Sequence, residues 1–300
     1  MCQVSVVIAT YRRREELGRA LASLAAQTAT DFEIVVVDDN AEASWNEAAQ
    51  RTVDAFRAEH PTLPITYIAN EKNEGSAQTR NIGIAAARGT YVTFLDDDDL
   101  YLPDKIKRQV DFMTDGGYDY SITDLDLYNE HEKLCDRRVR TAYLHEGMSA
   151  EELLCVHLKY HLTGTDTMMF KRAYLERIGG FAPINVGDEF YLMQRAIEGG
   201  GAFGYLPGSE VKAYIHTGEG GLSSGEGKIR GEKEIYRYKK TLFHKVDRKT
   251  RRYIRMRHYA VVAFACLRAK KPFHFFGNGI CSFFCSPLAC IKLLIARKHG

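Results

Sequence analysis

Along the first hundred residues, short apolar runs alternate with longer segments in which apolar residues recur at helical spacing. Four short runs of mostly apolar, β-branched and aromatic residues predict buried strands: Val4–Ala9, Ile34–Val37, Ile65–Ala69 and Tyr91–Leu95. Three segments between them place apolar residues at helical spacing: Arg13–Gln27, Trp45–Glu59 and Gln78–Arg88, the last with Gly89 as its C-terminal cap. Strands that alternate with helices predict an α/β fold with a mostly parallel sheet and right-handed crossovers.

The pattern is less regular in the rest of the chain. We expect a helix to begin near Pro103, a strand over Met168–Phe170 and a helix that ends at Gly199. Beyond residue 227, Lys228–Arg257 predicts two helices that break near Asp247. The segment that follows mixes basic residues with phenylalanines at positions 264, 273, 275, 276, 283 and 284.

Composition places the chain among soluble globular proteins, and its charge is unevenly distributed. Of the 300 residues, 45% are hydrophobic and 27% are charged, which excludes collagen-like, low-complexity and wholly disordered classes. The net charge of +2 hides two opposite halves, because residues 1–227 carry 22 Lys+Arg against 36 Asp+Glu and residues 228–300 carry 19 against 3. The sequence therefore predicts an acidic body, residues 1–227, joined to a basic helical tail, residues 228–300.

The basic tail predicts a binding partner. Basic amphipathic helices with aromatic residues lie in the headgroup region of anionic membranes, so an anionic membrane surface is the partner we expect. A homodimer or partner-protein interface is the alternative. Nucleic acid is not expected, because it would not require so many consecutive apolar residues.

Other signals concern the compartment. The seven cysteines contain no CxxC pair, so neither a disulfide framework nor a structural zinc site is expected. No signal peptide is recognised, and the apolar stretch Ile280–Ile295 is too short and interrupted to cross a bilayer. We therefore expect a cytoplasmic protein that lies peripherally on the inner face of the cell membrane.

Acidic residues follow two of the predicted strands directly. Asp38 and Asp39 follow the second strand, and Asp96–Asp99 follow the fourth. Ligands collect at the carboxyl ends of strands in such sheets, and a divalent cation with oxygen ligands would relieve the repulsion between adjacent aspartates. The alternative is a solvated acidic turn before the next helix.

These residues belong to a longer series of motifs that resembles family 2 glycosyltransferases, the inverting enzymes of the GT-A fold. The series consists of VSVVIATYRR, VVVDDN, NEGSAQTRNIGIAAARGTYVTFLDDDD, and RIGGF followed by GDEFYLMQRAIEGG. It runs in order over about residues 3–225. The resemblance implies a Rossmann-like catalytic domain over residues 1–227, with a nucleotide-sugar half (about 1–100) and an acceptor half (about 101–227).

The resemblance assigns donor-binding roles to matching positions. Those positions are Thr10, Tyr11, Arg12, Asp38, Asp39, Arg80, Asp96 and Asp97. Tyr11 would stack on the nucleotide base, Asp39 would accept a hydrogen bond from a uracil ring, and Arg80 would lie near the diphosphate. Tyr11 as an aromatic residue closing the sheet edge and Arg80 as an exposed helix charge are the alternatives.

The resemblance also implies a metal ion, Mn²⁺ or Mg²⁺. Asp98 matches the direct ligand and Asp96 the residue that reaches the ribose or a metal-bound water, while four adjacent acids leave the register ambiguous by one. His216 matches a histidine that holds the metal or the diphosphate, with a structural role as the alternative.

The catalytic base is expected among two adjacent carboxylates. The family usually carries Glu-Asp where this chain has Asp188-Glu189, and the spacing to Arg195 aligns Glu189 with the base. Asp188 is the substitute, and the pair could also stabilise the start of a helix. Asp166 and Thr165 are the expected acceptor contacts, with a purely structural turn as the alternative.

Together these features predict transfer of a single sugar from a nucleotide sugar, expected to be a UDP-sugar. The acceptor is expected to be a saccharide, carried on a polyprenyl diphosphate in bacterial cell-surface polysaccharide synthesis. The Gln-x-x-Arg-Trp motif of processive members is absent, since Trp45 is the only tryptophan. A sugar nucleotidyltransferase and an inactive membrane-bound scaffold are the alternatives.

Overall fold

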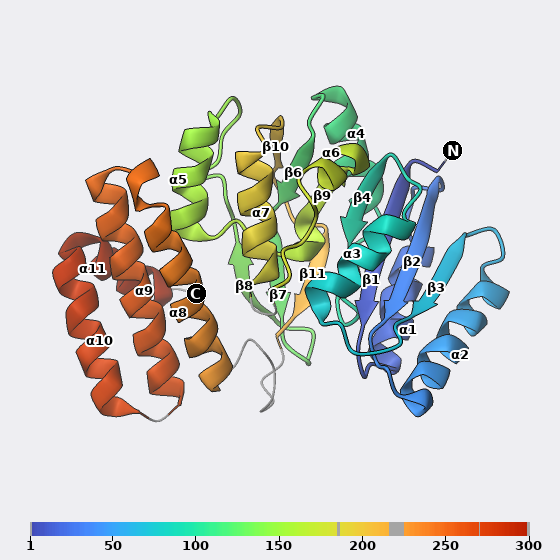
Figure 1. The fold of residues 1–300 in the computed structure, drawn as a ribbon, viewed down its shortest axis with the longest axis horizontal. Helices are drawn as coiled ribbons and strands as arrows, with labels where there is room; N and C mark the ends of the chain where they lie inside the picture. Colours follow the sequence, from blue (N-terminus) through green and yellow to red (C-terminus); the bar gives the residue numbers. More distant parts are fainter. Residues whose placement is uncertain (1, 185–186, 216–224, 270, 299–300) are drawn as a thin grey trace. The chain divides into compact units, whose positions relative to one another are not determined.

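The computed structural model describes residues 2–184, 187–215, 225–269 and 271–298 (Figure 1). They form two compact units. The first contains residues 1–150 and 162–215, and the second contains residues 151–161 and 216–300. Residues 151–161 thus belong with the tail, although they lie within the acidic body in the sequence.

A seven-stranded sheet forms the centre of the first unit. Its order is β10-β6-β9-β4-β1-β2-β3. The strands are β1 (Val4–Thr10), β2 (Phe32–Asp38), β3 (Ile65–Ala69), β4 (Tyr91–Phe94), β6 (Tyr120–Thr123), β9 (Met168–Lys171) and β10 (Phe203–Leu206). β9 runs antiparallel to both of its neighbours, and the other pairs are parallel. The predicted α/β class with a mostly parallel sheet is confirmed.

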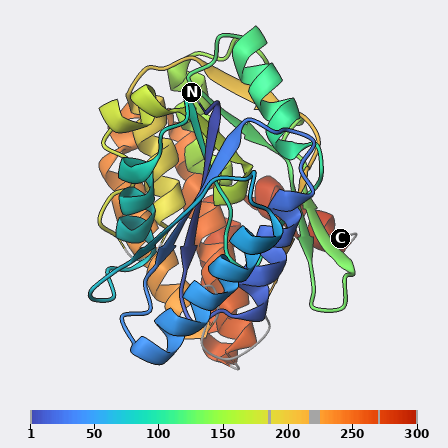
Figure 2. The same cartoon turned by 90° about the vertical axis from the view of Figure 1, so that its right-hand side faces the viewer.

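Helices cover both faces of the β1–β3 region, as Figures 1 and 2 show. The helices are α1 (Glu15–Ala25), α2 (Ala43–Glu59) and α3 (Ser76–Ala86). Val6 and Ile8 of β1 pack in one core with Leu21 of α1. Val7 points to the other face, where it contacts Gly83 of α3. Both faces of β1 are therefore apolar because both are covered, as the continuous apolar run predicts.

Gly89 has a different role from the one predicted. The C-cap of α3 is Ala87, so Gly89 does not end the helix. A Cβ atom on Gly89 would lie 2.5 Å from the backbone nitrogen of Ser5, and the Gly89 N–H donates to the Ser5 hydroxyl (2.8 Å). The glycine is needed where this loop approaches β1, which sequence spacing does not reveal.

A smaller sheet and further helices complete the first unit. The sheet has the order β5-β11-β7-β8, and the sequence analysis did not anticipate it. Its strands are β5 (Leu100–Tyr101), β7 (Leu125–Tyr128), β8 (Leu134–Arg138) and β11 (Val211–Tyr214). The helices are α4 (Lys105–Asp115), α6 (Arg172–Arg177), α7 (Asp188–Glu198) and the 3₁₀ turn η1 (Thr165–Thr167).

The elements described in the second unit are all helices. The helices are α5 (Ala150–Tyr160), α8 (Gly225–Thr241), η2 (Phe243–Lys245), α9 (Arg248–Arg268), α10 (Pro272–Cys285) and α11 (Pro287–Lys298). The predicted break near Asp247 is confirmed, since Asp247 caps α9 by accepting a hydrogen bond from the Thr250 N–H (2.6 Å). Among the described residues, no helix combines the length and apolar character needed to cross a membrane.

Candidate active site

The candidate site lies where β1, β2 and β4 end. Thr10 is the last residue of β1, Asp38 is the last residue of β2, and the four aspartates begin two residues after Phe94 of β4. Because these strands are parallel neighbours, their carboxyl ends meet at one edge of the sheet. This edge is the usual ligand-binding position in such a sheet.

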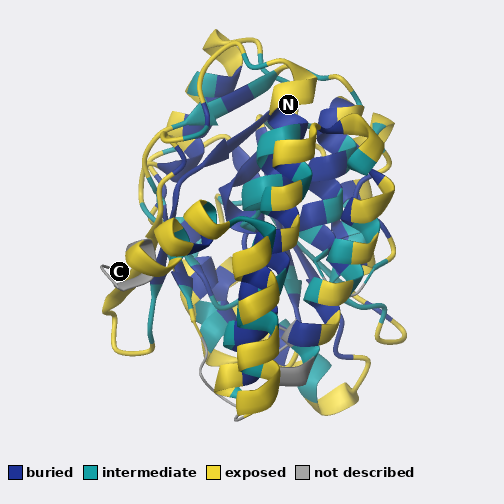
Figure 3. Ribbon diagram, turned by 90° about the vertical axis from the view of Figure 1, so that its left-hand side faces the viewer, coloured by how far each residue is buried: buried dark blue, intermediate teal, exposed yellow. Residues whose placement is uncertain are grey.

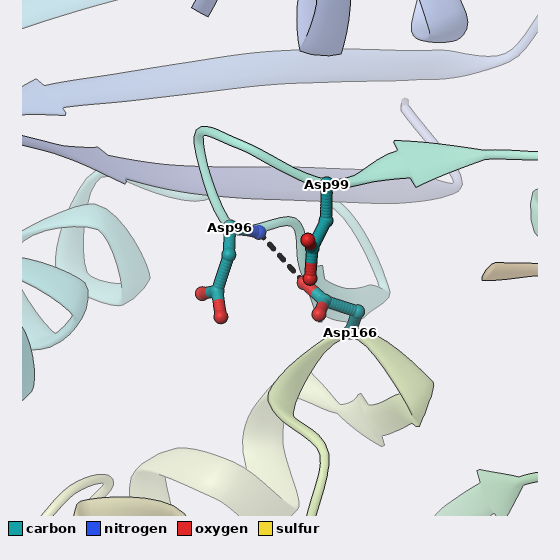
Figure 4. A group of neighbouring side chains, drawn as sticks. All are labelled: Asp96, Asp99 and Asp166. Atoms are coloured by element: carbon teal, nitrogen blue, oxygen red, sulfur yellow. Dashed lines mark hydrogen bonds between the residues drawn. The ribbon is translucent and has the colours of Figure 1, made fainter. Parts of the chain in front are cut away.

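Three carboxylates meet at this edge (Figure 4). Within the described part of the chain, the group able to surround an ion consists of Asp96, Asp99 and Asp166, with carboxylate oxygens within 4.8 Å of one another. The turn η1 brings Asp166 to the loop after β4, where its Oδ1 accepts a hydrogen bond from the Asp96 N–H (2.6 Å). Asp99 is anchored on the other side by the Tyr214 N–H of β11 (2.8 Å).

Burial makes this cluster unfavourable without a counter-charge. It raises the pKa of Asp166 to about 7, and the negative charge of Asp96 contributes. The pKa of Asp99 rises well above its ordinary value for the same reason, with the repulsion of Asp166 as the second cause. Three clustered oxygen donors, of which Asp99 and Asp166 have raised pKa values, suit a hard divalent cation, so these residues fit Mn²⁺ or Mg²⁺.

Arg80 of α3 links the carboxylate cluster to Asp188, one of the two candidate catalytic bases. Its Nη2 lies 2.5 Å from Asp96 Oδ1, and its Nη1 donates to Asp188 Oδ2 (2.8 Å). Burial alone would lower the pKa of the guanidinium, but Asp96 and Asp188 outweigh burial and raise the pKa. Arg80 is buried, so the alternative of an exposed helix charge does not describe its position.

Asp97 and Asp98 point to a different set of partners. Asp97 Oδ2 accepts hydrogen bonds from the Thr10 hydroxyl (2.8 Å) and the Tyr11 N–H (3.2 Å). Burial and the charge of Asp98 raise the pKa of Asp97 to about 7. Asp98 pairs with Arg13, whose Nη2 is 2.8 Å from Asp98 Oδ2. The structure thus brings Asp96 together with Asp99 and Asp166, and directs Asp98 toward Arg13.

The two candidate bases differ in their surroundings. Asp188 Oδ2 accepts from Arg80 and from the Ser76 hydroxyl (2.9 Å). Glu189 Oε2 accepts from the Gly164 N–H (2.7 Å). Burial, followed by the charge of Asp188, raises the pKa of Glu189. Both residues lie in the first turn of α7, so the predicted helix-stabilising position applies to them as well.

The residues expected around the nucleotide base occupy the ends of β1 and β2. Asp39 accepts hydrogen bonds from Asn70 (2.8 Å) and from the N–H groups of Glu74 (2.7 Å) and Gly75 (2.9 Å). It therefore orders the loop that leads into α3. Tyr11 is 45% exposed, which leaves its ring accessible for stacking.

Four further predicted residues complete the comparison. The Asp38 carboxylate is buried, and it accepts from the Tyr67 hydroxyl (2.6 Å). The Arg12 N–H donates to Asn40 Oδ1 (2.6 Å), and the Thr165 hydroxyl is 3.4 Å from Glu189 Oε2. His216 lies outside the described residues.

Several residues at the site were missed by the sequence analysis. Arg13 was read only as the start of a helix, although its pairing with Asp97 and Asp98 places it beside the acidic turn. Lys105 of α4 is buried behind the cluster, where its Nζ donates to the Tyr101 hydroxyl (2.8 Å) and contacts Thr93. Burial lowers the pKa of Lys105 well below its ordinary value. A lysine in a helix gives no sequence signal for such burial.

Comparisons with known proteins identify the family. The family model described as glycosyl transferase family 2 matches residues 5–179. An uncharacterized glycosyltransferase of Haemophilus influenzae is 34% identical over 105 residues, which cover 35% of this chain and 32% of the relative. The succinoglycan biosynthesis protein ExoO of Rhizobium meliloti is 28% identical over 231 residues, covering 73% and 62%. The chain thus spans less than two thirds of the length of these curated relatives.

Solved structures share the fold. Residues 1–349 of S. aureus TarS, in complex with UDP-GlcNAc, match with a TM-score of 0.61 and 17% identity, covering 94% of this chain and 91% of that one. The mannosyltransferase PcManGT from Pyrobaculum calidifontis, in complex with GDP-Man and Mn²⁺, matches with a TM-score of 0.54 and 18% identity, covering 99% and 76%. The family model covers more than half of the chain, and the architecture agrees with the expected one. This chain therefore belongs to glycosyl transferase family 2.

Proposed function

We propose that this protein is an inverting glycosyltransferase that moves one sugar from a nucleotide-sugar donor to a hydroxyl of a saccharide acceptor. One observation carries the proposal. The cluster of Asp96, Asp99 and Asp166 is joined through Arg80 to Asp188, which is adjacent to Glu189. Hydrogen bonds through Arg80 thus link the carboxylate cluster to the first turn of α7, which carries both candidate bases, at the edge of the sheet where ligands usually bind.

The donor is proposed to be a UDP-sugar. TarS and PcManGT, which share the fold, have been solved with UDP-GlcNAc and with GDP-Man and Mn²⁺, respectively. Uridine is favoured here because Asp39 matches the residue expected to accept from the uracil N–H, with Tyr11 positioned to stack on the base. Thr10, Arg12 and Asp38 would shape the rest of the base site. Arg80 would face the phosphates, and Asp97, which accepts from Thr10 and Tyr11, would lie on the side of the ribose.

The chain offers two ways to hold the cation, and both include Asp96. The resemblance pairs Asp96 with Asp98 and His216, whereas the geometry groups Asp96 with Asp99 and Asp166. A bound Mn²⁺ or Mg²⁺ would neutralise charge on the departing nucleoside diphosphate. Arg80, held by two carboxylates, is placed to add a fixed positive charge beside the same phosphates.

Glu189 is proposed to act as the base. It would remove the proton of the attacking hydroxyl as the new bond forms, with inversion at the anomeric carbon. Its raised pKa makes the carboxylate a stronger proton acceptor, and the Gly164 N–H fixes one oxygen. Asp188 is committed to Arg80 and Ser76, which favours a positioning role. Asp166 and Thr165 remain the proposed acceptor contacts.

The acceptor is proposed to be a saccharide on a polyprenyl diphosphate. The basic tail supports this proposal, because attachment to an anionic membrane would place the enzyme beside an acceptor confined to that membrane. The protein would then act peripherally on the inner face of the cell membrane.

A donor panel tests the proposal. The purified protein is incubated with Mn²⁺ or Mg²⁺ and with UDP-, GDP-, dTDP- and CMP-sugars, and nucleotide release is measured with and without lipid-linked saccharides. We expect release from one UDP-sugar only. If no nucleotide sugar is consumed under any of these conditions, the proposed activity is wrong.

The assignment of the base is tested by a matched pair of variants. Glu189→Gln should lower kcat by about 10²–10⁴-fold without weakening donor binding, since it removes the proton acceptor and keeps the shape. Asp188→Asn should weaken donor binding instead, because Arg80 loses a partner. Calorimetric donor binding and turnover are measured for both, and the opposite pattern would reverse the assignment.

A further inference from the structure

Exposed apolar side chains are concentrated in the last three helices. Of the fourteen large hydrophobic residues exposed in the described parts of the chain, ten lie between Leu267 and Ile295. Phe273, Phe284 and Leu288 have exposed fractions of 90%, 76% and 77%. Folded proteins rarely leave so many large apolar side chains together in water unless the surface has a partner. Figure 3 shows exposed residues in yellow on the helices next to the C-terminus.

The exposed apolar side chains of α10 follow one face of that helix. On α10 they are Phe273, Phe276, Ile280, Phe283 and Phe284. Spacings of three, four, three and one residues keep side chains on one side of a helix. The opposite side of α10 packs on α9, where the buried Ser282 hydroxyl donates to the Met256 carbonyl (2.9 Å). The apolar face of α10 is therefore turned away from its own core.

An apolar groove runs along this face. It has a volume of about 410 Å³, and its lining includes Phe264 of α9, Phe276 and Phe283 of α10, and Leu294 of α11. A second hollow of about 940 Å³ adjoins it, because Ile280 and Phe284 line both. The two hollows thus form one continuous surface of mixed chemistry.

Four arginines of α9 line the second hollow. They are Arg248, Arg251, Arg252 and Arg255, which a helix places on one face. The Nε groups of two of them donate to backbone carbonyls, Arg251 to Val246 (2.9 Å) and Arg252 to Cys285 (3.0 Å). No ion pair joins any of the four to a carboxylate among the described residues. Residues 248–300 contain no aspartate or glutamate at all.

We propose that this arginine-apolar surface, made by α9, α10 and α11, docks on an anionic phospholipid membrane. The arginines of α9 would contact lipid phosphates, and the apolar side chains of α10 and α11 would enter the outer part of the acyl region. The proposal deepens the membrane association proposed above by naming its residues, and it does not depend on the glycosyl-transfer reaction.

Charge distinguishes a membrane from a second copy of the chain. A dimer formed through this surface would bring two arginine rows together, and the surface supplies no carboxylate to pair with them. Anionic lipid phosphates beside an apolar layer match both components of the surface.

The arginine component is tested with charge-matched double variants of the full chain. Arg248→Gln with Arg255→Gln should weaken binding to vesicles of phosphatidylglycerol and phosphatidylcholine by about 25-fold at low salt, roughly fivefold for each arginine. Lys249→Gln with Arg257→Gln removes the same charge from α9 at positions that do not line the hollow, and should weaken binding less than about fivefold. Equal losses in the two pairs would overturn a docking role for this row.

The apolar component is tested at its most exposed positions. Phe273→Ser, Phe284→Ser and Leu288→Ser together should reduce vesicle binding by about 100-fold or more. The matched control is Leu134→Ser, Val139→Ser and Ile215→Ser, three exposed apolar positions of the first unit, and it should bind as the unmodified chain does. Circular dichroism checks that the helices are retained.

Depth of insertion provides an independent readout. A tryptophan introduced by Phe284→Trp should be quenched by brominated lipids, whereas one introduced by Leu134→Trp should not, with Trp45 as the common background. Absence of quenching at position 284 would overturn insertion. The proposal would also be overturned if the unmodified chain forms a stable dimer and does not bind vesicles, and if the triple serine substitution dissociates that dimer.

Failure of the two proposals can be told apart. The arginine and serine variants should keep their donor-dependent nucleotide release in detergent, because none of the altered residues belongs to the candidate active site. A protein that binds vesicles as described but consumes no nucleotide sugar would overturn the proposed reaction and leave the docking surface intact.

Discussion

The carboxylate cluster of the first unit and the arginine-apolar surface of the second both concentrate charge of one sign, but they do so in opposite environments. Asp99 and Asp166 are buried and held by backbone N–H groups, and Arg80 is the nearby counter-charge. The four arginines of α9 line a hollow open to solvent. Burial makes like charges costly, and one compact cation, as proposed for this cluster, would offset that cost. Exposed charges are screened by salt and suit an extended anionic surface.

The largest expected effect comes from removing one ligand of the buried cluster. Asp99→Asn should lower transfer by at least about 10²-fold and raise the Mn²⁺ concentration needed for half-maximal rate, because a cation loses a charged ligand. Asp98→Asn makes the same chemical change at the residue that pairs with Arg13 and should have a smaller effect. Steady-state rates at several Mn²⁺ concentrations measure both. A larger loss for Asp98→Asn would assign the ion to the pair implied by the family resemblance.

The pH dependence of stability should reveal Asp166 of this cluster, together with Asp97 of the acidic turn beside it, without any assay of activity. Asp97 and Asp166 have pKa values of about 7 in the folded chain, against 3.8 ordinarily. They bind protons more tightly when folded, so their contribution to the free energy of unfolding falls as pH rises from about 4 to about 7. Mn²⁺ at 100 times its Kd should restore about 2.7 kcal/mol at pH 8, or roughly 5–10 °C in Tm, and much less at pH 5.

Thermal unfolding with Mn²⁺ or with a chelator measures this difference. The Asp99→Asn variant is the control, and it should lose most of the stabilisation by Mn²⁺ at pH 8. An equal gain in Tm at pH 5 and pH 8 would contradict binding at the buried carboxylates.

The smallest expected effects are changes in the free energy of unfolding when one glycine of each unit is replaced by alanine. Gly89→Ala should lower the free energy of unfolding by about 1–3 kcal/mol, because its Cβ would meet the backbone of Val4 and Ser5. Gly277→Ala on α10 has open space and should raise stability by about 0.5–1 kcal/mol through helix propensity. Chemical denaturation of both variants tests this contrast, and a loss at position 277 would mean that α10 is covered.

The alternating strands and helices of the first hundred residues could be predicted because each is indicated by residues that are close together in the sequence. The apolar runs of β1 to β4 and the spacing of α1 and α2 correspond to single elements, and Asp247 marks a helix start by its own side chain. The smaller sheet escaped prediction because β5 has two residues and all five residues of β8 are exposed. Such strands carry no apolar pattern of their own.

The candidate site also has features that could be predicted from the sequence and others that could not. That acidic residues follow β2 and β4 could be read from the chain, and the order of motifs identified the family, which the family model confirms. The assignment of individual roles stays a prediction. Asp166 was expected to contact the acceptor, and nothing near it in the sequence indicates its approach to Asp96 across 70 residues.

The sequence by itself determined the strand-helix alternation, the family and the separation of an acidic body from a basic tail, because each follows from residues close together in the chain. Only the tertiary structure decided which aspartates converge, that Arg80 joins Asp96 to Asp188, and that the arginines of α9 adjoin the apolar face of α10. These relations depend on contacts between distant segments. In the four adjacent aspartates, the direction of each side chain is set by the partner that reaches it.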